Sequence, residues 1–166
     1  MDPIKEALTF DDVTLAPNYS EILPSEVKTD VQLSKYLNIS IPLLTSAMDT
    51  VTESDMAISI SKRGGIGVIH RNLSISDQIK EIRKVKAKKM LVGAAVGASI
   101  NEHIRAQKIL KENIDLIVVD TAHGHTKKVA EIIKKIKKMK PTKTALCAGN
   151  IATAEAAKFL IKQGVD

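Results

Sequence analysis

The segment with the clearest chemical potential is Leu116-Ile-Val-Val-Asp120-Thr-Ala-His-Gly-His125, in which a carboxylate follows four apolar residues. Four apolar residues in succession predict a strand that is buried on both faces. Asp120 then lies at the carboxyl end of this strand, where parallel α/β sheets bind their ligands. A carboxylate at that place can bind a sugar hydroxyl or take part in a reaction. The alternative is that Asp120 only caps the helix that follows.

Three other segments place small or polar residues after an apolar run: Ser46-Ala-Met-Asp-Thr-Val-Thr52, His70-Arg-Asn72 and Ala148-Gly-Asn150. Thr50 or Thr52 is expected to cap the next helix, with Asp49 adding a favourable charge at the helix N-terminus. Arg71 carries a guanidinium suited to a phosphate, although an exposed loop arginine is the commoner case. Asn150 offers both a hydrogen-bond donor and an acceptor.

The histidines and the single cysteine suggest weaker alternatives. His123 and His125 stand two residues apart near Asp120, as zinc ligands can, so a metal-dependent hydrolase is a rival interpretation. The supply of further ligands is poor, because one of the two remaining histidines, His103, is expected inside a helix. Cys147 lies within an apolar run and is expected to be a buried, unreactive thiol, since no neighbour in the sequence would lower its pKa.

Short apolar runs alternate with helical patterns along most of the chain. Strands are expected at 41–46, 66–70, 90–96, 116–120 and 144–148, and helices at 52–62, 76–86, 101–112, 127–143 and 153–163. Gly164 is expected to end the last helix, and Gly64–Gly67 enters a strand and therefore predicts a turn, not a dinucleotide fingerprint. Five βα units require a parallel sheet with right-handed crossovers. Either an open, doubly wound sheet or a (β/α)8 barrel cut after its fifth helix satisfies this pattern.

The first 40 residues lack such periodicity and predict an arm instead of a domain, with a possible short strand at 10–15. The chain has 166 residues, 44% of them hydrophobic and 27% charged, which predicts one globular domain. No apolar run is long enough to span a membrane, the N-terminus does not resemble a signal peptide, and a single cysteine suits the cytoplasm.

The net charge of +6 is concentrated in the helix expected at 127–143. Its lysines and apolar residues fall on opposite faces, as in a helix that lies on the surface of a domain. With two Phe, two Tyr and no Trp, the chain has no aromatic platform for bases, so neither nucleic acid nor a membrane is expected as a partner.

Taken together, these segments resemble those of a known enzyme family. The chain resembles the inosine-5′-monophosphate (IMP) dehydrogenases along essentially its whole length, in 8–13 (LTFDDV), 46–53 (SAMDTVTE), 64–70 (GGIGVIH), 92–97 (VGAAVG), 120–125 (DTAHGH) and 148–150 (AGN). The sister family of GMP reductases typically has Asn-Gly-Tyr where this chain has His123-Gly-His125, so the dehydrogenases are the better match.

The resemblance implies a (β/α)8 TIM barrel, of which this chain supplies the N-terminal arm and about five βα units. It also implies oxidation of IMP to XMP with NAD⁺ in guanine nucleotide synthesis, through a purine intermediate bound to a cysteine, in a cytoplasmic homotetramer activated by K⁺. By position, the NAD site would include Asp120, Thr121 and Ala122. The IMP site would include Ser46, Met48 and Asn150. Arg71 falls where the family often has Lys or His, and the resemblance gives it no role.

The chain departs from the family pattern in two places. The pair of CBS regulatory modules usually found near 86–90 is absent, and the chain stops before a sixth strand. The nucleophilic cysteine and the K⁺ ligands are therefore expected after Asp166, no catalytic residue or metal ligand is expected within the chain, and the 166 residues alone are expected to be inactive. A GMP reductase-type enzyme and a half-barrel binding module without catalysis remain as alternatives.

Overall fold

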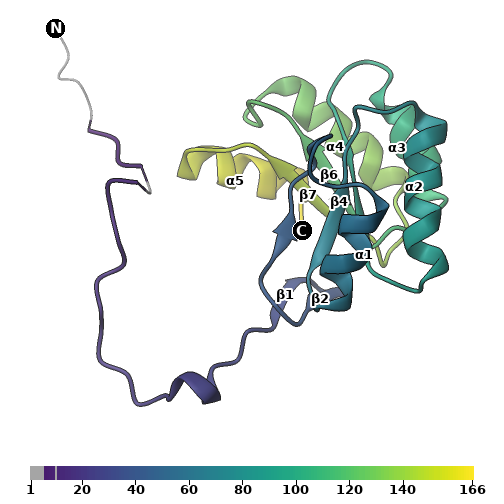
Figure 1. Cartoon of the computed structure of the whole chain (residues 1–166). Coiled ribbons are helices and arrows are strands. Elements are labelled where there is room, and N and C mark those ends of the chain that lie inside the picture. Colours follow the sequence, from purple (N-terminus) through teal and green to yellow (C-terminus); the bar gives the residue numbers. More distant parts are fainter. Residues whose placement is uncertain (1–5, 10) are drawn as a thin grey trace, which may run out of the picture.

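The computed structural model describes residues 6–9 and 11–166 (Figure 1). After a short 3-10 helix at Pro24–Glu26 and an antiparallel hairpin, β1 (Val31–Ser34) and β2 (Leu37–Ile39), five βα units follow. Their strands are β3 (Leu44–Thr45), β4 (Ile66–Ile69), β5 (Val92–Val96), β6 (Leu116–Asp120) and β7 (Ala145–Gly149). Their helices are α1 (Ser54–Lys62), α2 (Ile75–Ala87), α3 (Glu102–Leu110), α4 (Lys127–Met139) and α5 (Ala154–Gln163).

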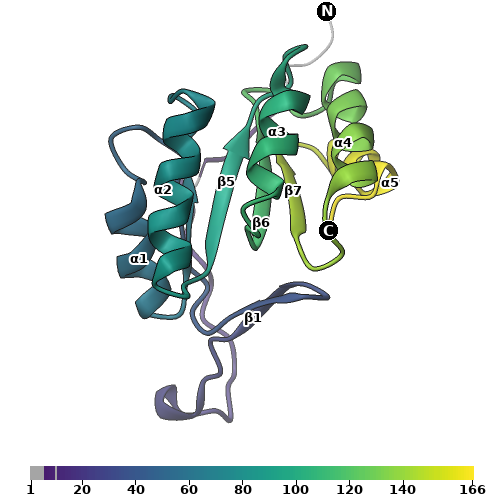
Figure 2. The same ribbon diagram turned by 90° about the vertical axis from the view of Figure 1, so that its right-hand side faces the viewer.

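The order of the strands decides between the two architectures that the sequence allowed. The five strands lie in the order β3-β4-β5-β6-β7, and every pair is parallel. A doubly wound sheet reverses its strand order at a switch point and carries helices on both faces. Here the order never reverses, and the helices lie along one face of a curled sheet (Figure 2). The structure is thus a partial (β/α)8 barrel, as the resemblance implied.

The main hydrophobic core lies between the sheet and the helices. Alternate residues of the strands, such as Ile117 and Leu146, point outward and pack against helix residues such as Ile82, Ile109 and Ile133. Each of these isoleucines is fully buried, and burial of such a side chain contributes about 1.5–3 kcal/mol. Helix α4 has the two faces expected of it, because its apolar residues are buried and most of its lysines are exposed.

A second core lies on the inner face, at the amino ends of the strands. Leu37 and Ile39 of the hairpin are buried there against Ile66, Leu116 and other inward-facing strand residues. The hairpin lies across the amino ends of the strands (Figure 2), so it closes one end of the half-barrel. The carboxyl ends of the strands are left as the open end.

The N-terminal arm differs from the expectation in two respects. The hairpin was not predicted, because each strand has only three or four residues and offers little periodicity. Phe10 lies outside the described residues, and residues 11–15 form no strand, so the extra strand expected at 10–15 is wrong for the part that is described. The arm runs away from the sheet (Figure 1), and Leu15 and Tyr19 are 94% and 84% exposed.

The helix ends follow simple capping rules. The hydroxyl oxygens of Ser74, Thr126 and Thr153 accept hydrogen bonds from the third residue of α2, α4 and α5 respectively. Gly164 ends α5 with a positive φ of 86°, which confirms the expected glycine C-cap. These caps fix where each loop at the open end meets its helix.

Candidate functional site

Two adjoining hollows lie at the carboxyl ends of the strands. The larger, of about 480 Å3, is lined by Leu44, Thr45, Ser46, Ala47, Met48, Val68, Val118, Asp120, Cys147 and Asn150. The smaller, of about 390 Å3, is lined by Ala47, Met48, Asp49, His70, Arg71, Asn72 and Asp120. They share Ala47, Met48 and Asp120, so together they form one continuous cleft. This is the end of the barrel at which such folds bind their ligands.

The cleft contains four of the six residues proposed for ligand binding. Ser46, Met48, Asp120 and Asn150 come from three different βα units and line the larger hollow. Thr121 and Ala122 line neither hollow. Met48 is 54% exposed, so it offers a flexible apolar surface on the wall of the cleft.

Asp120 is the last residue of β6 and is half-buried. Its carboxylate makes no hydrogen bond or ion pair with the described part of the chain, and it lies where the two hollows meet. The cap of the following helix is Thr126, six residues later, whose side chain accepts from the N–H of Val129 at 3.3 Å. The capping interpretation of Asp120 is therefore wrong, and the carboxylate is available to a ligand.

Backbone hydrogen bonds join the loop after β6 to the loop after β7. The Thr121 N–H and hydroxyl both donate to the Gly149 carbonyl, at 3.0 and 2.7 Å. The Asn150 N–H donates to the Thr121 carbonyl at 2.7 Å, and the Gly124 N–H donates to the Asn150 carbonyl at 2.7 Å. Thr121 thus has a structural role, because it holds Asn150 beside Asp120.

Gly124 is needed for this close approach. A Cβ atom at this position would lie 2.8 Å from the Asn150 carbonyl oxygen and 3.1 Å from two backbone atoms of Gly149. No real Cβ tolerates the first distance, so any other residue would push the two loops apart. The glycine in the segment His123-Gly-His125 is therefore explained by packing between two loops of the site.

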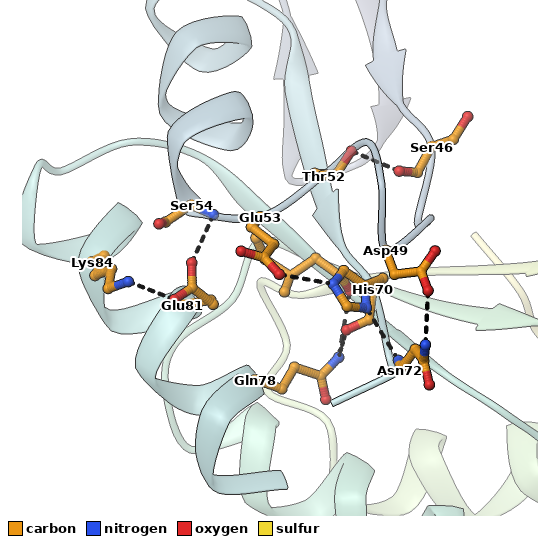
Figure 3. Close-up of polar contacts among 11 residues, drawn as sticks. Ser46, Asp49, Thr52, Glu53, Ser54, His70, Asn72, Gln78, Glu81 and Lys84 are labelled. Atoms are coloured by element: carbon orange, nitrogen blue, oxygen red, sulfur yellow. Dashed lines mark hydrogen bonds and ion pairs between the residues drawn. The ribbon is translucent and has the colours of Figure 1, made fainter. Parts of the chain in front are cut away.

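A buried histidine clamps the loop after β4 (Figure 3). His70 is 2% exposed. Its Nδ1 accepts from the Asn72 N–H at 3.2 Å, and its Nε2 lies 3.3 Å from a carboxylate oxygen of Glu53, which places the ring proton on Nε2. The Asn72 side chain then donates to Asp49 at 2.8 Å. The loops after β3 and β4, which form one wall of the cleft, are thereby fixed to each other.

The fully buried side chain of Gln78 also holds the loop after β4. The Gln78 amide nitrogen donates to the carbonyls of His70 and Ala95, at 3.1 and 2.9 Å. Its amide oxygen accepts from the Arg105 guanidinium at 2.9 Å, and Arg105 also donates to the Leu73 carbonyl at 3.0 Å. Helices α2 and α3 therefore hold the carboxyl ends of β4 and β5 through buried polar groups.

The caps expected at the start of α1 are absent. Thr52 is fully buried, and its hydroxyl donates to the Ser46 carbonyl at 2.6 Å, so it stabilises the loop that carries Ser46 and Met48. The first turn of α1 instead donates its Ser54 N–H to the carboxylate of Glu81 in α2, at 2.9 Å (Figure 3). The expectation that Thr50 or Thr52 caps the helix is wrong, because a neighbouring helix supplies the acceptor.

Cys147 is exposed, which contradicts the expectation of a buried thiol. It points into the larger hollow, on the inner face of β7, where the described chain leaves it reachable by solvent. The surrounding protein still removes much of its hydration, and this burial, together with the negative charge of Asp120, raises the pKa of the thiol. A raised pKa disfavours the thiolate, so the expected low reactivity is supported although the expected burial is not.

His123 and His125 do not converge on a common point. Both are exposed, their ring centres lie 6.5 Å apart, and His125 packs at 4.7 Å from the ring of Phe159 in α5. The described residues contain no group of three or more His, Cys, Asp and Glu side chains that could hold a metal ion. The hydrolase alternative therefore lacks a third ligand within the described ranges.

The residues that sequence reasoning missed are those that hold the loops in place. Gln78 occupies the apolar stripe of α2 between Ile75 and Ile82, and a polar residue on an apolar stripe signals a buried hydrogen-bonding role. His70 and Glu53 are 17 residues apart, and no local spacing could pair them. Arg105 likewise meets Gln78 only through the packing of α3 on α2.

The chain is similar to known proteins over almost its whole length. Residues 7–166 match the family model described as "IMP dehydrogenase / GMP reductase domain". Among curated proteins, the chain is 42% identical to an inosine-5′-monophosphate dehydrogenase of Borreliella burgdorferi, over 98% of this chain and 52% of that protein. It is 35% identical to the enzyme of the same name from Cryptosporidium parvum, over 98% of this chain and 50% of that protein.

A third relative, from Staphylococcus saprophyticus and of the same name, is 29% identical over 98% of this chain and 59% of its own length. The chain thus spans about half the length of the curated relatives it matches. Among the described residues, no helix is both long and apolar enough to cross a lipid bilayer.

Proposed function

Because the chain belongs to the IMP dehydrogenase / GMP reductase domain family, we propose that it supplies the N-terminal half of an enzyme that oxidises IMP to XMP with NAD⁺. This reaction is a step of guanine nucleotide synthesis. The observation that carries the proposal is the cleft at the open end of the half-barrel, where Ser46, Met48, Asp120 and Asn150 meet. The names of the curated relatives support the same activity.

The reaction converts IMP, NAD⁺ and water into XMP, NADH and a proton. The purine C2 loses a hydride to the cofactor and gains an oxygen from water. On this chain, we assign Ser46 and Met48 to the bound nucleotide, with the Met48 thioether against the purine, and Asn150 to a hydrogen bond beside the reacting base. All three lie on loops that are held by Thr52 or by the Thr121 to Gly149 contacts.

NAD⁺ fits the chemistry of the cleft. When bound, it accepts the hydride. The Asp120 carboxylate at the rim has no partner among the described residues, and it can accept hydrogen bonds from two ribose hydroxyls. Such charge-assisted bonds are stronger than neutral ones. Thr121 and Ala122 are proposed to line the dinucleotide site from the adjoining backbone, and Thr121 keeps Asp120 and Asn150 adjacent.

The remaining machinery is proposed to lie outside these 166 residues. The nucleophilic cysteine and the K⁺ ligands belong to the half of the barrel that the relatives have in addition. Cys147 lies in the cleft, but its raised pKa argues against it as the nucleophile. We propose a homotetramer in the cytoplasm as the complete assembly.

The short connection between α2 and β5 supports the proposed absence of CBS modules from this chain. The match to the S. saprophyticus protein extends over 289 residues, although this chain has only 166. The relative therefore carries additional residues within the matched span. In this chain α2 ends at Ala87 and β5 begins at Val92, and the short turn between them contains Lys89 with a positive φ of 58°. This turn lies at the closed end of the half-barrel, so a regulatory module inserted there would not obstruct the cleft.

The proposal is tested by completing the barrel. The chain is joined at Asp166 to the C-terminal half of the B. burgdorferi relative, and the formation of NADH is followed by absorbance. IMP-dependent reduction of NAD⁺ is expected, with the two halves separately inactive. A folded chimera that instead oxidises NADPH in the presence of GMP would assign the chain to the reductase branch. A folded chimera without either activity would favour a binding module.

A further inference from the structure

Arg71 lines the cleft, and the proposed function gives its positive charge no role. It follows His70 in the loop after β4 and lines the smaller hollow with Asp49 and Asp120. Its side chain is exposed and makes no hydrogen bond or ion pair with the described residues. Among the residues lining that hollow, it is the only one with a permanent positive charge.

The position of the guanidinium is set by its surroundings. The backbone of the loop is held on both sides of Arg71, by Gln78 at the His70 carbonyl and by His70 at the Asn72 N–H. A Cβ atom added to Gly97 would lie only 3.2–3.3 Å from the guanidinium of Arg71. The side chain therefore lies over the end of β5, and the absence of a side chain at Gly97 makes room for it.

The charges of the hollow require a cationic partner for any anionic ligand. Asp49 and Asp120 would both repel a phosphate. Asp49 already accepts a hydrogen bond from Asn72, whereas Asp120 accepts none from the described chain. A dinucleotide that places a ribose on Asp120 must place its pyrophosphate a few ångströms further along, because the two groups are joined covalently. Arg71 on the rim of the same hollow is the group available to bind that charge.

We infer that Arg71 binds the pyrophosphate of the dinucleotide whose ribose is held by Asp120. The planar guanidinium can donate two parallel hydrogen bonds to phosphate oxygens, which a lysine ammonium cannot. Arg71 would then set both the affinity for the phosphate-bearing cofactor and its orientation along the rim, from β6 towards β5. This inference rests on the proposed function, since it assumes that Asp120 holds a ribose.

The alternative is that Arg71 only balances the charge of Asp49 and Asp120. In that case its removal would change the binding of every charged ligand in the hollow, including the nicotinamide riboside cation. The two explanations are separated by ligands that share the nicotinamide ribose but differ in phosphate content. Nicotinamide riboside has no phosphate, whereas NAD⁺ contains the pyrophosphate.

The experiment measures the binding of both ligands to the full chain, from the shifts of backbone amide signals in NMR titrations. Wild type is compared with Arg71→Ala, Arg71→Lys and the control Arg63→Ala. Arg63 is an exposed arginine at the end of α1, bonded only to Ser59 of its own helix, and it lies away from the cleft. The Arg63→Ala variant therefore removes the same charge as Arg71→Ala but leaves the residues of the cleft unchanged. The unliganded spectra of the variants show whether the fold is retained.

Arg71→Ala is expected to weaken NAD⁺ binding about 10- to 100-fold, as for loss of a charge-assisted hydrogen bond. Nicotinamide riboside should bind as before, Arg71→Lys should lie between wild type and Arg71→Ala, and Arg63→Ala should bind like wild type. A change in the affinity for nicotinamide riboside as large as the change for NAD⁺, or no loss for NAD⁺, would overturn the inference and leave the proposed function standing. Failure of the folded wild-type chain to bind NAD⁺ would also overturn the inference, whereas the proposed function is decided by the activity of the completed barrel.

Discussion

Replacement of Gln78 by leucine tests whether buried polar groups hold the wall of the cleft. Leucine has nearly the volume of glutamine but cannot donate to the carbonyls of His70 and Ala95 or accept from Arg105. Both carbonyls lie at the carboxyl ends of adjacent strands, and Gln78 is fully buried, so water has little access to replace the lost donor.

The expected destabilisation follows from these contacts. A buried polar group left without its partner costs about 1–3 kcal/mol, and a hydrogen bond to a charged group contributes about 1.5–3 kcal/mol. Arg105 keeps its hydrogen bonds to Leu73 and Glu102. The loss of its bond to Gln78 should therefore cost about 1.5 kcal/mol, the lower limit of the second range. For the two carbonyls and the arginine bond together the sum is about 3.5–7.5 kcal/mol, a large part of the roughly 5–15 kcal/mol that stabilises a typical domain.

The change in the free energy of unfolding is measured by urea denaturation at one fixed protein concentration. Amide hydrogen exchange then shows where protection is lost, and the ends of β4 and β5 should exchange first. The matched control is Gln107→Leu, at an exposed position of α3, which should change stability by less than about 0.5 kcal/mol. A Gln78→Leu variant within about 1 kcal/mol of wild type, with unchanged exchange at β4 and β5, would refute the reasoning.

Four further predictions concern the cleft and the open sheet. Asp120→Ala should weaken NAD⁺ binding by about 1.5–3 kcal/mol while IMP binding changes little, as measured by NMR titrations with each of the two ligands; an unchanged affinity for NAD⁺ would refute the assignment of Asp120 to the ribose. Cys147 should be alkylated slowly near neutral pH and faster as the pH rises towards its raised pKa, because only the thiolate reacts; a rate already maximal at neutral pH would contradict this. Gly124→Ala should destabilise the chain by about 1–3 kcal/mol and shift the amide signal of Asn150, whereas an unperturbed Asn150 signal would show that the loops can yield. The chain alone should form assemblies larger than a monomer in light scattering, since the inner face exposes apolar residues such as Leu44; a monodisperse monomer would argue against this.

The five βα units could be predicted from the sequence because each is a local pattern. The apolar run Leu116–Val119 and the amphipathic stretch of α4 each contain enough residues to identify their element, and the structure places both as expected. The position of Asp120 at the rim follows from the end of its strand alone. The choice between barrel and doubly wound sheet did not follow, because periodicity does not record which strands are neighbours.

The parts that could not be predicted depend on contacts between distant residues. The burial of His70 is fixed by Glu53 and Asn72, which belong to two different loops. The hairpin at β1 and β2 forms because Leu37 and Ile39 find an apolar surface at the amino ends of the sheet, not because its own sequence favours strands strongly. Cys147 was assigned to the interior because it lies in an apolar strand, although only alternate residues of β7 face the helices.

The identity of strand order and chain order has a consequence for synthesis on the ribosome. Each new strand of the five-stranded sheet pairs with the one made just before it, so none of these five strands must wait for a later strand in order to pair. Each pairing must still close a loop that contains a whole helix, which makes parallel sheets slower to form than local contacts, but domains fold from the N-terminus as they emerge. The nascent chain is therefore expected to add its βα units one at a time, with the exposed edge of each strand serving as the template for the strand that follows it in this sheet.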